Sequence, residues 1–375
     1  MKILRIYNDL NKNLHPNKVL IIYGPRQVGK TTLLKDFLSV SGIKYKLDSG
    51  DNIKSQHILG SQDFTVLKEY AEGYELIAID EAQKISGIGQ ALKILVDQVP
   101  GIKLIATGSS SFELAGQVGE PLTGRKLTLH LYPISQLELS LRYNPAEIKE
   151  RLPEWLVYGG YPEVVTTSNK QEKARILEEI VQSYLLKDIL ELERIKSSKI
   201  ILDVLRLIAF QIGKEVSLTE IGQQIGIDYK TVARYLDLFE KSFIIYSLRG
   251  FSRNLRKEIS KKCKYFFYDN GVRNAIVSNF NALELRNDIG ELWENFIFME
   301  RLKKRSYKKI FANCYFWRTW DQKEVDLVEE MEGKLYGYEI KWSKDKIKPP
   351  EDWINTYENA SFEVINKENY LGFVA

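Results

Sequence analysis

The feature that most constrains the fold is an apolar strand that runs into a glycine-rich turn and then into a helix. The strand is KVLIIY at 18–23, the turn is GPRQVGKT at 24–31, and helical spacing continues to residue 38. The turn fits the pattern G-x-x-x-x-G-K-[ST], which between a strand and a helix indicates a phosphate-binding loop. Its glycines let backbone N–H groups face an anion, and the helix N-terminus adds a favourable dipole. The motif therefore predicts a site for the phosphates of a nucleoside triphosphate.

Short apolar strands alternate with helical stretches over the first third of the chain. Beyond the first strand, the expected strands are at 43–48, 74–80 and 103–110. Strand–helix alternation of this kind implies a parallel sheet with helices on both faces. The fold class predicted for residues 1–140 is therefore α/β, a P-loop NTPase domain.

The loop and the strand after it supply the groups that a Mg·ATP site needs. Lys30 can reach the β- and γ-phosphate oxygens, and Thr31 can ligate Mg²⁺. Asp80 ends an apolar strand and can join the Mg²⁺ shell, directly or through a water. Glu81 follows at once, placed to polarise the attacking water as a general base. The alternative for this pair is two surface acids at a strand end. The expected nucleotide-binding residues are Gly24, Pro25, Arg26, Gln27, Val28, Gly29, Lys30, Thr31, Thr32, Asp80 and Ser109.

Two further positions are candidates for sensing or completing this site. The strand LIATGSS ends in small hydroxyl residues, so Thr107 or Ser109 is a candidate γ-phosphate sensor, unless this is a plain strand-to-loop transition. Arg125 lies in a predicted loop and is a candidate arginine finger toward a neighbour's nucleotide. Its alternative is a solvated surface arginine. A finger would require a homo-oligomer.

Length and composition bound the remaining possibilities. A chain of 375 residues suggests two or three domains. The net charge of +4 excludes a protein that coats nucleic acid along its whole length, but basic clusters lie at 249–264 and 303–309. Each is either solvated surface or a phosphate contact. The two cysteines, Cys263 and Cys314, have no metal-ligand spacing and are interpreted as free thiols in a reducing compartment.

Targeting and membrane signals are missing from the sequence. The first residues lack an apolar segment of signal-peptide length, and no run of 18 apolar residues occurs. We therefore expect a cytoplasmic protein with no membrane partner.

The middle of the chain, 141–268, is predicted to be helical with a helix-turn-helix. A helix is expected at 178–195 after a turn at 158–165. The segment 217–245 has two helices around Gly226, and Ser217 or Thr219 can cap the first. The apolar stretches on either side of the 249–264 cluster can pair as a wing. The residues that would face a DNA groove are Asp228, Tyr229, Lys230, Thr231 and Arg234. A protein-contact or lid role for the same segment is equally compatible with the sequence.

The last part, 269–375, is predicted to be α/β. An amphipathic helix is expected at 290–304, followed by strands at 314–320, 324–330 and 335–342. The three predicted domains are therefore 1–140, 141–268 and 269–375.

These motifs together resemble the AAA-type ATPases of bacteria and archaea. The match is to a subgroup with a GPRQVGKT-like loop and DEAQ after the acidic strand, and here TGSS and GR…LYP complete the likeness. Members of this subgroup carry a C-terminal region described as a domain of unknown function. Its features in this chain are YGGYPEVV, YFFYDNGVRNAI and GELWENFIF. The resemblance spans nearly the whole chain.

The resemblance also implies a C-terminal core similar to restriction-endonuclease-like, PD-(D/E)xK nucleases. The matching residues are Glu294 in the helix, Asp326 in EVDLV, and Glu339 and Lys341 in YEIKW. Three such carboxylates could hold Mg²⁺, which would activate a water, and Lys341 would orient that water or neutralise the transition state. Glu-x-Lys alone has no weight, because the same EIK tripeptide occurs at 147–149. Related domains also keep such a core as a scaffold.

Two functional hypotheses follow. The first is an ATPase whose nucleotide state gates DNA binding or cleavage. The second is an ATP-dependent switch that acts through protein partners and has an inactive nuclease-like domain. A nucleotide kinase or a transporter ATPase is weaker, because no membrane segment supports transport and the adjacent Asp80 and Glu81 favour hydrolysis.

Overall fold

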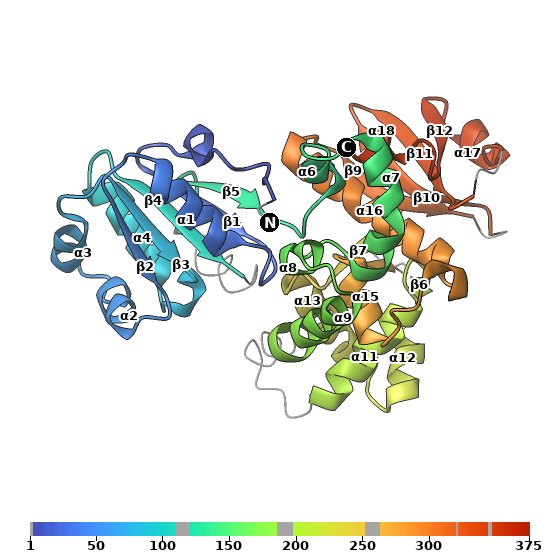
Figure 1. Cartoon of the computed structure of the whole chain (residues 1–375), viewed down its shortest axis with the longest axis horizontal. Coiled ribbons are helices and arrows are strands. Elements are labelled where there is room, and N and C mark those ends of the chain that lie inside the picture. The colour runs from blue at the N-terminus through green and yellow to red at the C-terminus, as the bar shows by residue number, and fades with distance from the viewer. Residues whose placement is uncertain (1–2, 110–120, 186–197, 252–262, 320–321, 344–346) are drawn as a thin grey trace. The chain divides into compact units, whose positions relative to one another are not determined.

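The computed structural model describes residues 3–109, 121–185, 198–251, 263–319, 322–343 and 347–375 (Figure 1). They divide into two compact units. The P-loop unit comprises Leu4–Tyr132 with Lys241–Phe243, and the C-terminal unit contains Pro133–Glu240 and Ile244–Ala375. The finer division into three domains stays a prediction.

The P-loop unit is built on a five-stranded sheet in the order β2-β3-β4-β1-β5 (Figure 1). Every neighbouring pair in this sheet is parallel. The parallel α/β sheet expected from the sequence is confirmed, and a fifth strand that was not expected lies beside β1. The strands are β1 (Lys18–Tyr23), β2 (Tyr45–Ser49), β3 (Leu76–Asp80), β4 (Lys103–Gly108) and β5 (Lys126–His130).

The central strands form this sheet because their side chains are apolar on both faces. From Val19 to Tyr23 every residue of β1 is buried, and β3 and β4 are buried almost throughout. Helix α4 buries an apolar stripe that includes Ile88, Leu92 and Leu95. The helices of this unit, short 3-10 turns included, are η1 (Leu10–Asn13), α1 (Lys30–Val40), α2 (Ile53–Gly60), α3 (Phe64–Ala71), η2 (Ala82–Lys84) and α4 (Ile88–Gln98).

The C-terminal unit contains a seven-stranded mixed sheet in the order β12-β11-β10-β9-β7-β8-β6. Strand β7 pairs antiparallel with β8, as expected of the two apolar stretches, and parallel with β9. The boundary predicted at residue 268 therefore crosses a continuous sheet. The strands are β6 (Glu215–Val216), β7 (Ile245–Gly250), β8 (Cys263–Phe267), β9 (Asn313–Arg318), β10 (Glu324–Met331), β11 (Lys334–Ile340) and β12 (Ala360–Ile365).

The helices of the C-terminal unit include the expected amphipathic helix, which is α16. They are α6 (Gln136–Leu139), α7 (Pro145–Tyr158), α8 (Pro162–Thr166), α9 (Lys170–Glu179), the π-helical turn η3 (Ile180–Leu185), α11 (Ser198–Phe210), α12 (Leu218–Ile225), α13 (Tyr229–Lys241), α15 (Asn270–Ile276), the 3-10 turn η4 (Leu283–Leu285), α16 (Ile289–Lys308), α17 (Glu351–Thr356) and α18 (Tyr370–Val374). Of the helix predicted at 178–195, residues 186–197 lie outside the described part of the chain.

The predicted helix-turn-helix is present as α12 and α13. Gly226 adopts a φ of 80° between them, which glycine accommodates without strain, and Ser217 rather than Thr219 caps α12. The basic residues of the loop between β7 and β8, at 252–262, lie outside the described residues. The contribution of that cluster to a wing therefore stays a prediction.

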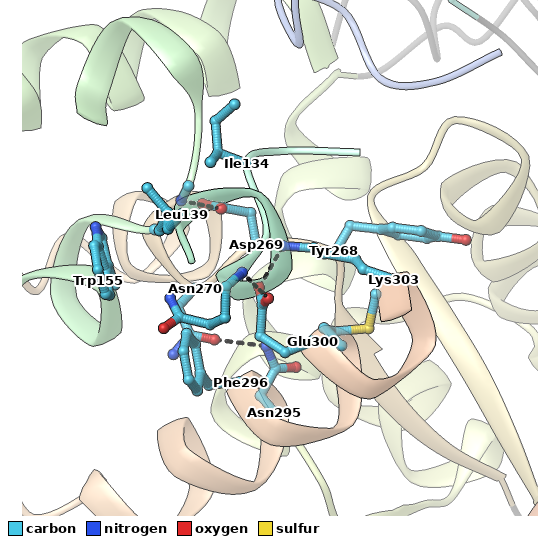
Figure 2. A pocket seen from close by; sticks show the side chains of 14 residues that line it. Ile134, Leu139, Trp155, Tyr268, Asp269, Asn270, Asn295, Phe296, Glu300 and Lys303 are labelled. Carbon is cyan, nitrogen blue, oxygen red and sulfur yellow. Dashed lines mark hydrogen bonds and ion pairs between the residues drawn. The ribbon is translucent and has the colours of Figure 1, made fainter. Parts of the chain in front are cut away.

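A buried polar cluster anchors the turn at Gly159 and Gly160 to the start of α15 (Figure 2). The Asp269 carboxylate accepts from the Gly160 N–H at 2.6 Å and from the Val272 N–H at 3.1 Å. Burial raises the pKa of Asp269, although these N–H groups and Lys303 oppose the shift. The YGGYP segment is thus fixed by hydrogen bonds as well as by glycine geometry.

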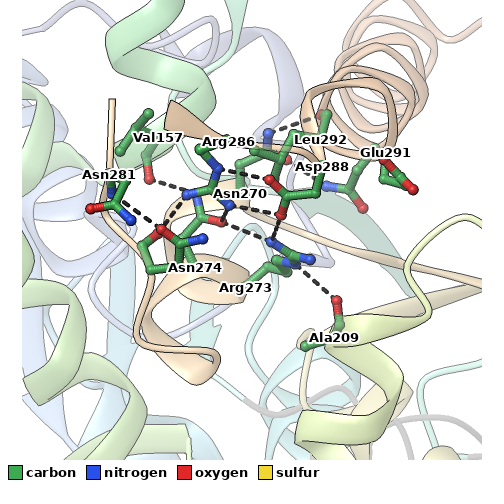
Figure 3. Close-up of polar contacts among 12 residues, drawn as sticks. Val157, Ala209, Asn270, Arg273, Asn274, Asn281, Arg286, Asp288, Glu291 and Leu292 are labelled. Carbon is green, nitrogen blue, oxygen red and sulfur yellow. Dashed lines mark hydrogen bonds and ion pairs between the residues drawn. The ribbon is translucent and has the colours of Figure 1, made fainter. Parts of the chain in front are cut away.

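A second polar network ties α15 to the residues before α16 (Figure 3). Arg273 donates to Asp288 at 2.5 Å, and Arg286 donates to both oxygens of Asp288 at 2.8 Å. Asn274 donates to the carbonyls of Leu156 and Val157 on α7. The polar residues of the DNGVRN segment therefore serve to hold helices together, because buried polar groups require such partners.

Candidate functional site

The glycine-rich loop lies at the carboxyl end of β1 and leads into α1. Gly24 has no room for a side chain, since a Cβ there would be 1.9 Å from the Leu131 carbonyl oxygen. Gln27 and Gly29 adopt φ values of 59° and 92°, so the loop turns sharply before the first helical residue. The glycines thus let the backbone take a conformation that places N–H groups at the start of a helix of 11 residues, where anions bind.

Lys30 and Thr31 are held by hydrogen bonds at the start of α1. The Lys30 ammonium is 4% exposed and donates to the carbonyls of Gly24 at 2.8 Å and Pro25 at 2.7 Å. The Thr31 hydroxyl donates to Asp80 Oδ2 at 2.7 Å. The loop threonine and the strand-end aspartate, each expected to ligate Mg²⁺, therefore lie in contact.

The Asp80 carboxylate is bound on its second oxygen by Thr107. The Thr107 hydroxyl donates to Asp80 Oδ1, and it accepts from the Glu81 N–H at 3.2 Å. Thr107 is fully buried at the end of β4. Of the two candidate sensors, Thr107 is the one that contacts the candidate metal ligand directly.

Glu81 is connected to the other candidate sensor through Gln83. The Gln83 side-chain amide donates to Glu81 Oε2 at 2.7 Å and to the Ser109 hydroxyl at 3.0 Å. Glu81 itself adopts a left-handed φ of 50° directly after β3, which turns its side chain out of the strand. Gln83 was not expected from the sequence, although it belongs to the DEAQ motif.

Arg5 also supports the loop and was missed by sequence reasoning. It is 8% exposed, and its guanidinium donates to the carbonyls of Val28 at 2.6 Å and Tyr132 at 2.5 Å. It therefore links the phosphate-binding loop to the chain after β5. A single arginine 19 positions before the loop carries no local signal of this role.

The other predicted loop residues differ in exposure. Pro25 and Val28 are buried, Arg26 is partly buried, and Gln27 and Thr32 are exposed.

Arg125 does not lie beside the loop of its own chain. It donates to Asp97 at 2.8 Å and precedes the first residue of β5, which pairs with Val19 near the start of β1. Because β1 and β5 are parallel, both begin at the same edge of the sheet, where Arg125 lies, whereas the phosphate-binding loop follows the carboxyl end of β1 at the opposite edge. A role as a finger would therefore require the nucleotide of another chain.

Two residues of the second predicted group, Glu294 and Asp326, line a cleft of about 780 Å³ in the C-terminal unit. Glu294 comes from α16 and Asp326 from β10, and Lys264 of β8 lies between carboxylates. The Lys264 ammonium contacts Glu324 and lies 3.4 Å from Glu294 Oε1. Lys264 was expected to belong to the wing region.

Glu294, Asp326 and Glu339, which were expected to hold one or two Mg²⁺ ions, each lie near a lysine side chain. Glu339 pairs with Lys341 at 2.7 Å, and Asp326 accepts from the Ile340 N–H at 2.8 Å and lies 3.5 Å from the Lys341 ammonium. Among the described residues, no three histidine, cysteine or carboxylate side chains are grouped so as to hold a metal. Lys264 pairs with Glu294, and Lys341 pairs with Glu339, so the role of these carboxylates as metal ligands stays a prediction.

Burial and mutual repulsion shift the protonation of this cluster. Burial raises the pKa of Glu294 to about 8, with Asp326 and Glu324 adding to the rise and Lys264 opposing it. Burial and Asp326 also raise the pKa of Glu339. Burial alone would lower the pKa of Lys341, but Asp326 and Glu339 outweigh it and raise that pKa. The acids and lysines of this cluster therefore influence one another's protonation.

The predicted DNA-facing residues begin α13. Asp228 accepts from the N–H groups of Lys230 at 2.9 Å and Thr231 at 3.1 Å, and from the Thr231 hydroxyl at 2.6 Å. Its carboxylate is therefore committed to capping the helix, and Tyr229, Lys230 and Arg234 are exposed.

Comparisons with known proteins match three segments of the chain. Residues 16–140 match an AAA domain, and residues 149–283 and 289–361 each match a domain of unknown function. An uncharacterized protein of Mycobacterium tuberculosis is 28% identical over 88% of this chain and 72% of its own length. One of Haemophilus influenzae is 28% identical over 83% of this chain and 79% of its own length. Among solved structures, a Walker-type ATPase of Pyrococcus abyssi is 16% identical, with a TM-score of 0.48 over 73% of this chain and 94% of that one.

The motif, the parallel sheet and the family model agree on the class of the first region. Residues 16–140 form an AAA-type P-loop domain of the kind that binds nucleotides. The C-terminal segments match families without an assigned function. Within the described part of the chain, no helix has the length and apolar character that crossing a membrane requires.

Proposed function

We propose that the chain binds ATP with Mg²⁺ and hydrolyses it at the site formed by residues 24–31, Asp80 and Glu81. The observation that carries the proposal is the Thr31 hydroxyl on Asp80, at the carboxyl edge of a parallel sheet and next to the phosphate-binding loop. The residues fit Mg·ATP. A buried lysine is directed onto the loop carbonyls, and a hydroxyl and a carboxylate that suit Mg²⁺ already touch.

Each residue has a distinct task in this proposal. The loop N–H groups and Lys30 bind the phosphates, and Thr31 and Asp80 hold the magnesium. Bound Mg²⁺ would neutralise charge that develops on the phosphates. Glu81 accepts a proton from the attacking water, and Gln83 and Ser109 orient its carboxylate through the bonds described above. Thr107 fixes Asp80 from the side opposite Thr31.

The test is phosphate release and nucleotide binding in two variants. Lys30→Ala is expected to lose nucleotide binding or turnover, whereas Glu81→Gln is expected to bind ATP and hydrolyse it poorly. Lys35→Ala, on the same helix but outside the loop, is the matched control for Lys30. Phosphate release that is unchanged in both site variants would refute the assignment.

For the output of this ATPase, we propose DNA binding through the unit that contains α12 and α13. The order α11, β6, α12, α13, β7, β8 supports a winged helix-turn-helix, and Lys230 is exposed at the start of α13. Affinity for duplex DNA should fall steeply with salt, because phosphate contacts release counterions. Lys230→Ala should reduce that slope by about one. Binding that is insensitive to salt would refute the proposal.

The second candidate is an ATP-dependent switch that acts through protein partners and does not cleave DNA. The pairing of the C-terminal carboxylates with Lys264 and Lys341 favours it over an active nuclease. Plasmid and branched DNA should be incubated with Mg²⁺ or Mn²⁺, with and without ATP. Cleavage by the native protein that Asp326→Ala abolishes would refute this candidate and establish DNA processing.

Assembly and location complete the proposal. A homo-oligomer would let Arg125 act on a neighbour's nucleotide, and Arg125→Ala would then lose ATPase activity while Asp97→Ala would retain it. Equal activity of Arg125→Ala and the native protein would remove that role. We also propose a cytoplasmic location, because neither Cys263 nor Cys314 forms a disulfide.

A further inference from the structure

Lys264 is a buried cation inside a cluster of carboxylates. Its side chain is 3% exposed, it contacts Glu324, and its ammonium lies 3.4 Å from Glu294 Oε1 and 5.3 Å from the centre of the Phe316 ring. The Lys264 side chain is therefore enclosed by acidic side chains from α16 and β10.

The Lys264 ammonium lies beside residues that were expected to bind a metal ion. Glu294 and Asp326, two of the three expected ligands, line the cleft together with Lys264. The third, Glu339, is paired with Lys341, whose side chain is far more exposed, at 39%. Because the cleft has a volume of about 780 Å³, access for a hydrated ion is not the obstacle.

A divalent ion could bind Glu294 and Asp326 together only by displacing Lys264. Mg²⁺ needs oxygen ligands at about 2.0–2.1 Å, closer than carboxylates that flank an ammonium can provide. The divalent ion and the Lys264 ammonium are both positive, so they would repel each other strongly in this poorly solvated site. Glu294 has little freedom to turn away, because its carboxylate packs on Gly213, where an added Cβ would lie 3.1 Å from Oε2.

We propose that Lys264 takes the place of a divalent cation in this cluster, so that the native site binds neither Mg²⁺ nor Mn²⁺ and becomes a metal site only when that side chain is removed. The C-terminal unit then does not activate a water by metal coordination. The carboxylates that resemble a nuclease centre serve to hold Lys264 and to join β8 to α16 and β10.

The experiment measures Mn²⁺ binding by electron paramagnetic resonance on the full chain without nucleotide. All variants carry Thr31→Ala, so that the P-loop site does not contribute and failure of the ATPase assignment leaves this test unaffected. The native cluster and Lys341→Met, the matched lysine control, are expected to bind no Mn²⁺ at 1 mM. Lys264→Met is expected to bind one Mn²⁺ per chain with a Kd below about 1 mM, the weak end for carboxylate sites. Adding Asp326→Asn should abolish that binding.

Three results would overturn the proposal. The first is Mn²⁺ binding by the native cluster that Asp326→Asn removes. The second is an equal gain in Mn²⁺ binding in Lys264→Met and Lys341→Met. The third is no gain in Mn²⁺ binding in a folded Lys264→Met protein. Folding is checked by tryptophan fluorescence, since all six tryptophans lie in the C-terminal unit. If Lys264→Met unfolds in metal-free buffer, Mn²⁺ is expected to restore the fold, and failure to do so would also overturn the proposal.

Discussion

Replacing Arg5 by alanine should destabilise the P-loop unit more than a typical surface change. The arginine makes two hydrogen bonds to buried carbonyls, to Val28 at 2.6 Å and to Tyr132 at 2.5 Å. A hydrogen bond from a charged donor contributes about 1.5–3 kcal/mol. Losing both gives a decrease of about 3–6 kcal/mol in the free energy of unfolding of this unit. Arg5→Lys, whose ammonium lacks the forked geometry, should lose roughly half of that.

Hydrogen exchange by mass spectrometry is the appropriate assay for Arg5. Tryptophan fluorescence would not report on this unit, because its residues include no tryptophan. Peptides that contain β1 and β4 should exchange faster in Arg5→Ala, and the ratio of rates gives the change in opening free energy. ATP affinity should fall at least about tenfold, because the loop must be reordered before it binds.

A matched control for Arg5 is Arg125→Ala. Arg125 has a side chain that is 40% exposed and pairs with Asp97, and such a surface ion pair contributes about 0–1 kcal/mol. If Arg5→Ala changes the opening free energy by less than about 1 kcal/mol, or no more than Arg125→Ala does, the assigned role of Arg5 is wrong.

Three other substitutions test separate parts of the structure. Gly24→Ala should lose about 1–3 kcal/mol of stability and most ATP binding, because its Cβ would lie 1.9 Å from the Leu131 oxygen. In Gly60→Ala, the matched control, the Cβ would lie 3.5 Å from its nearest neighbour, so calorimetry should show neither effect. Gln83→Leu should lower kcat for ATP hydrolysis about tenfold with little change in KM, because it releases the general base, and a change in KM alone would contradict this. Asp288→Ala should destabilise the C-terminal unit by about 3–5 kcal/mol, because it leaves two buried arginines without their carboxylate. Urea unfolding followed by tryptophan fluorescence measures this change. Asp203→Ala, which breaks the exposed pair with Arg206, should cost less than about 1 kcal/mol in the same assay.

The P-loop site could be predicted from the sequence because its parts lie next to regular elements. Lys30 and Thr31 follow a strand and open a helix, and Asp80 ends the third strand in sequence. Parallel strands bring their carboxyl ends to one edge, so the contact between Thr31 and Asp80 follows from topology alone. Arg5 lies before the first strand, in a segment without periodicity. Its contacts depend on the final tertiary packing, so no pattern in the sequence could have revealed them.

The carboxylate cleft shows the limit of motif reasoning more sharply. Glu294, Asp326, Glu339 and Lys341 occur in the order and spacing of a nuclease centre, and the expected helix and strands that carry them are present. Spacing fixes which carboxylates face a common region, but it does not fix which cation neutralises them. That cation is supplied by β8, from a segment predicted to belong to another domain. A buried carboxylate cluster must be neutralised by a metal, by protons or by a basic side chain, because isolated buried charges are too costly. In the proposal made above, Lys264 meets this requirement beside Glu294, Glu324 and Asp326, so that the same carboxylates would provide structure instead of a metal site.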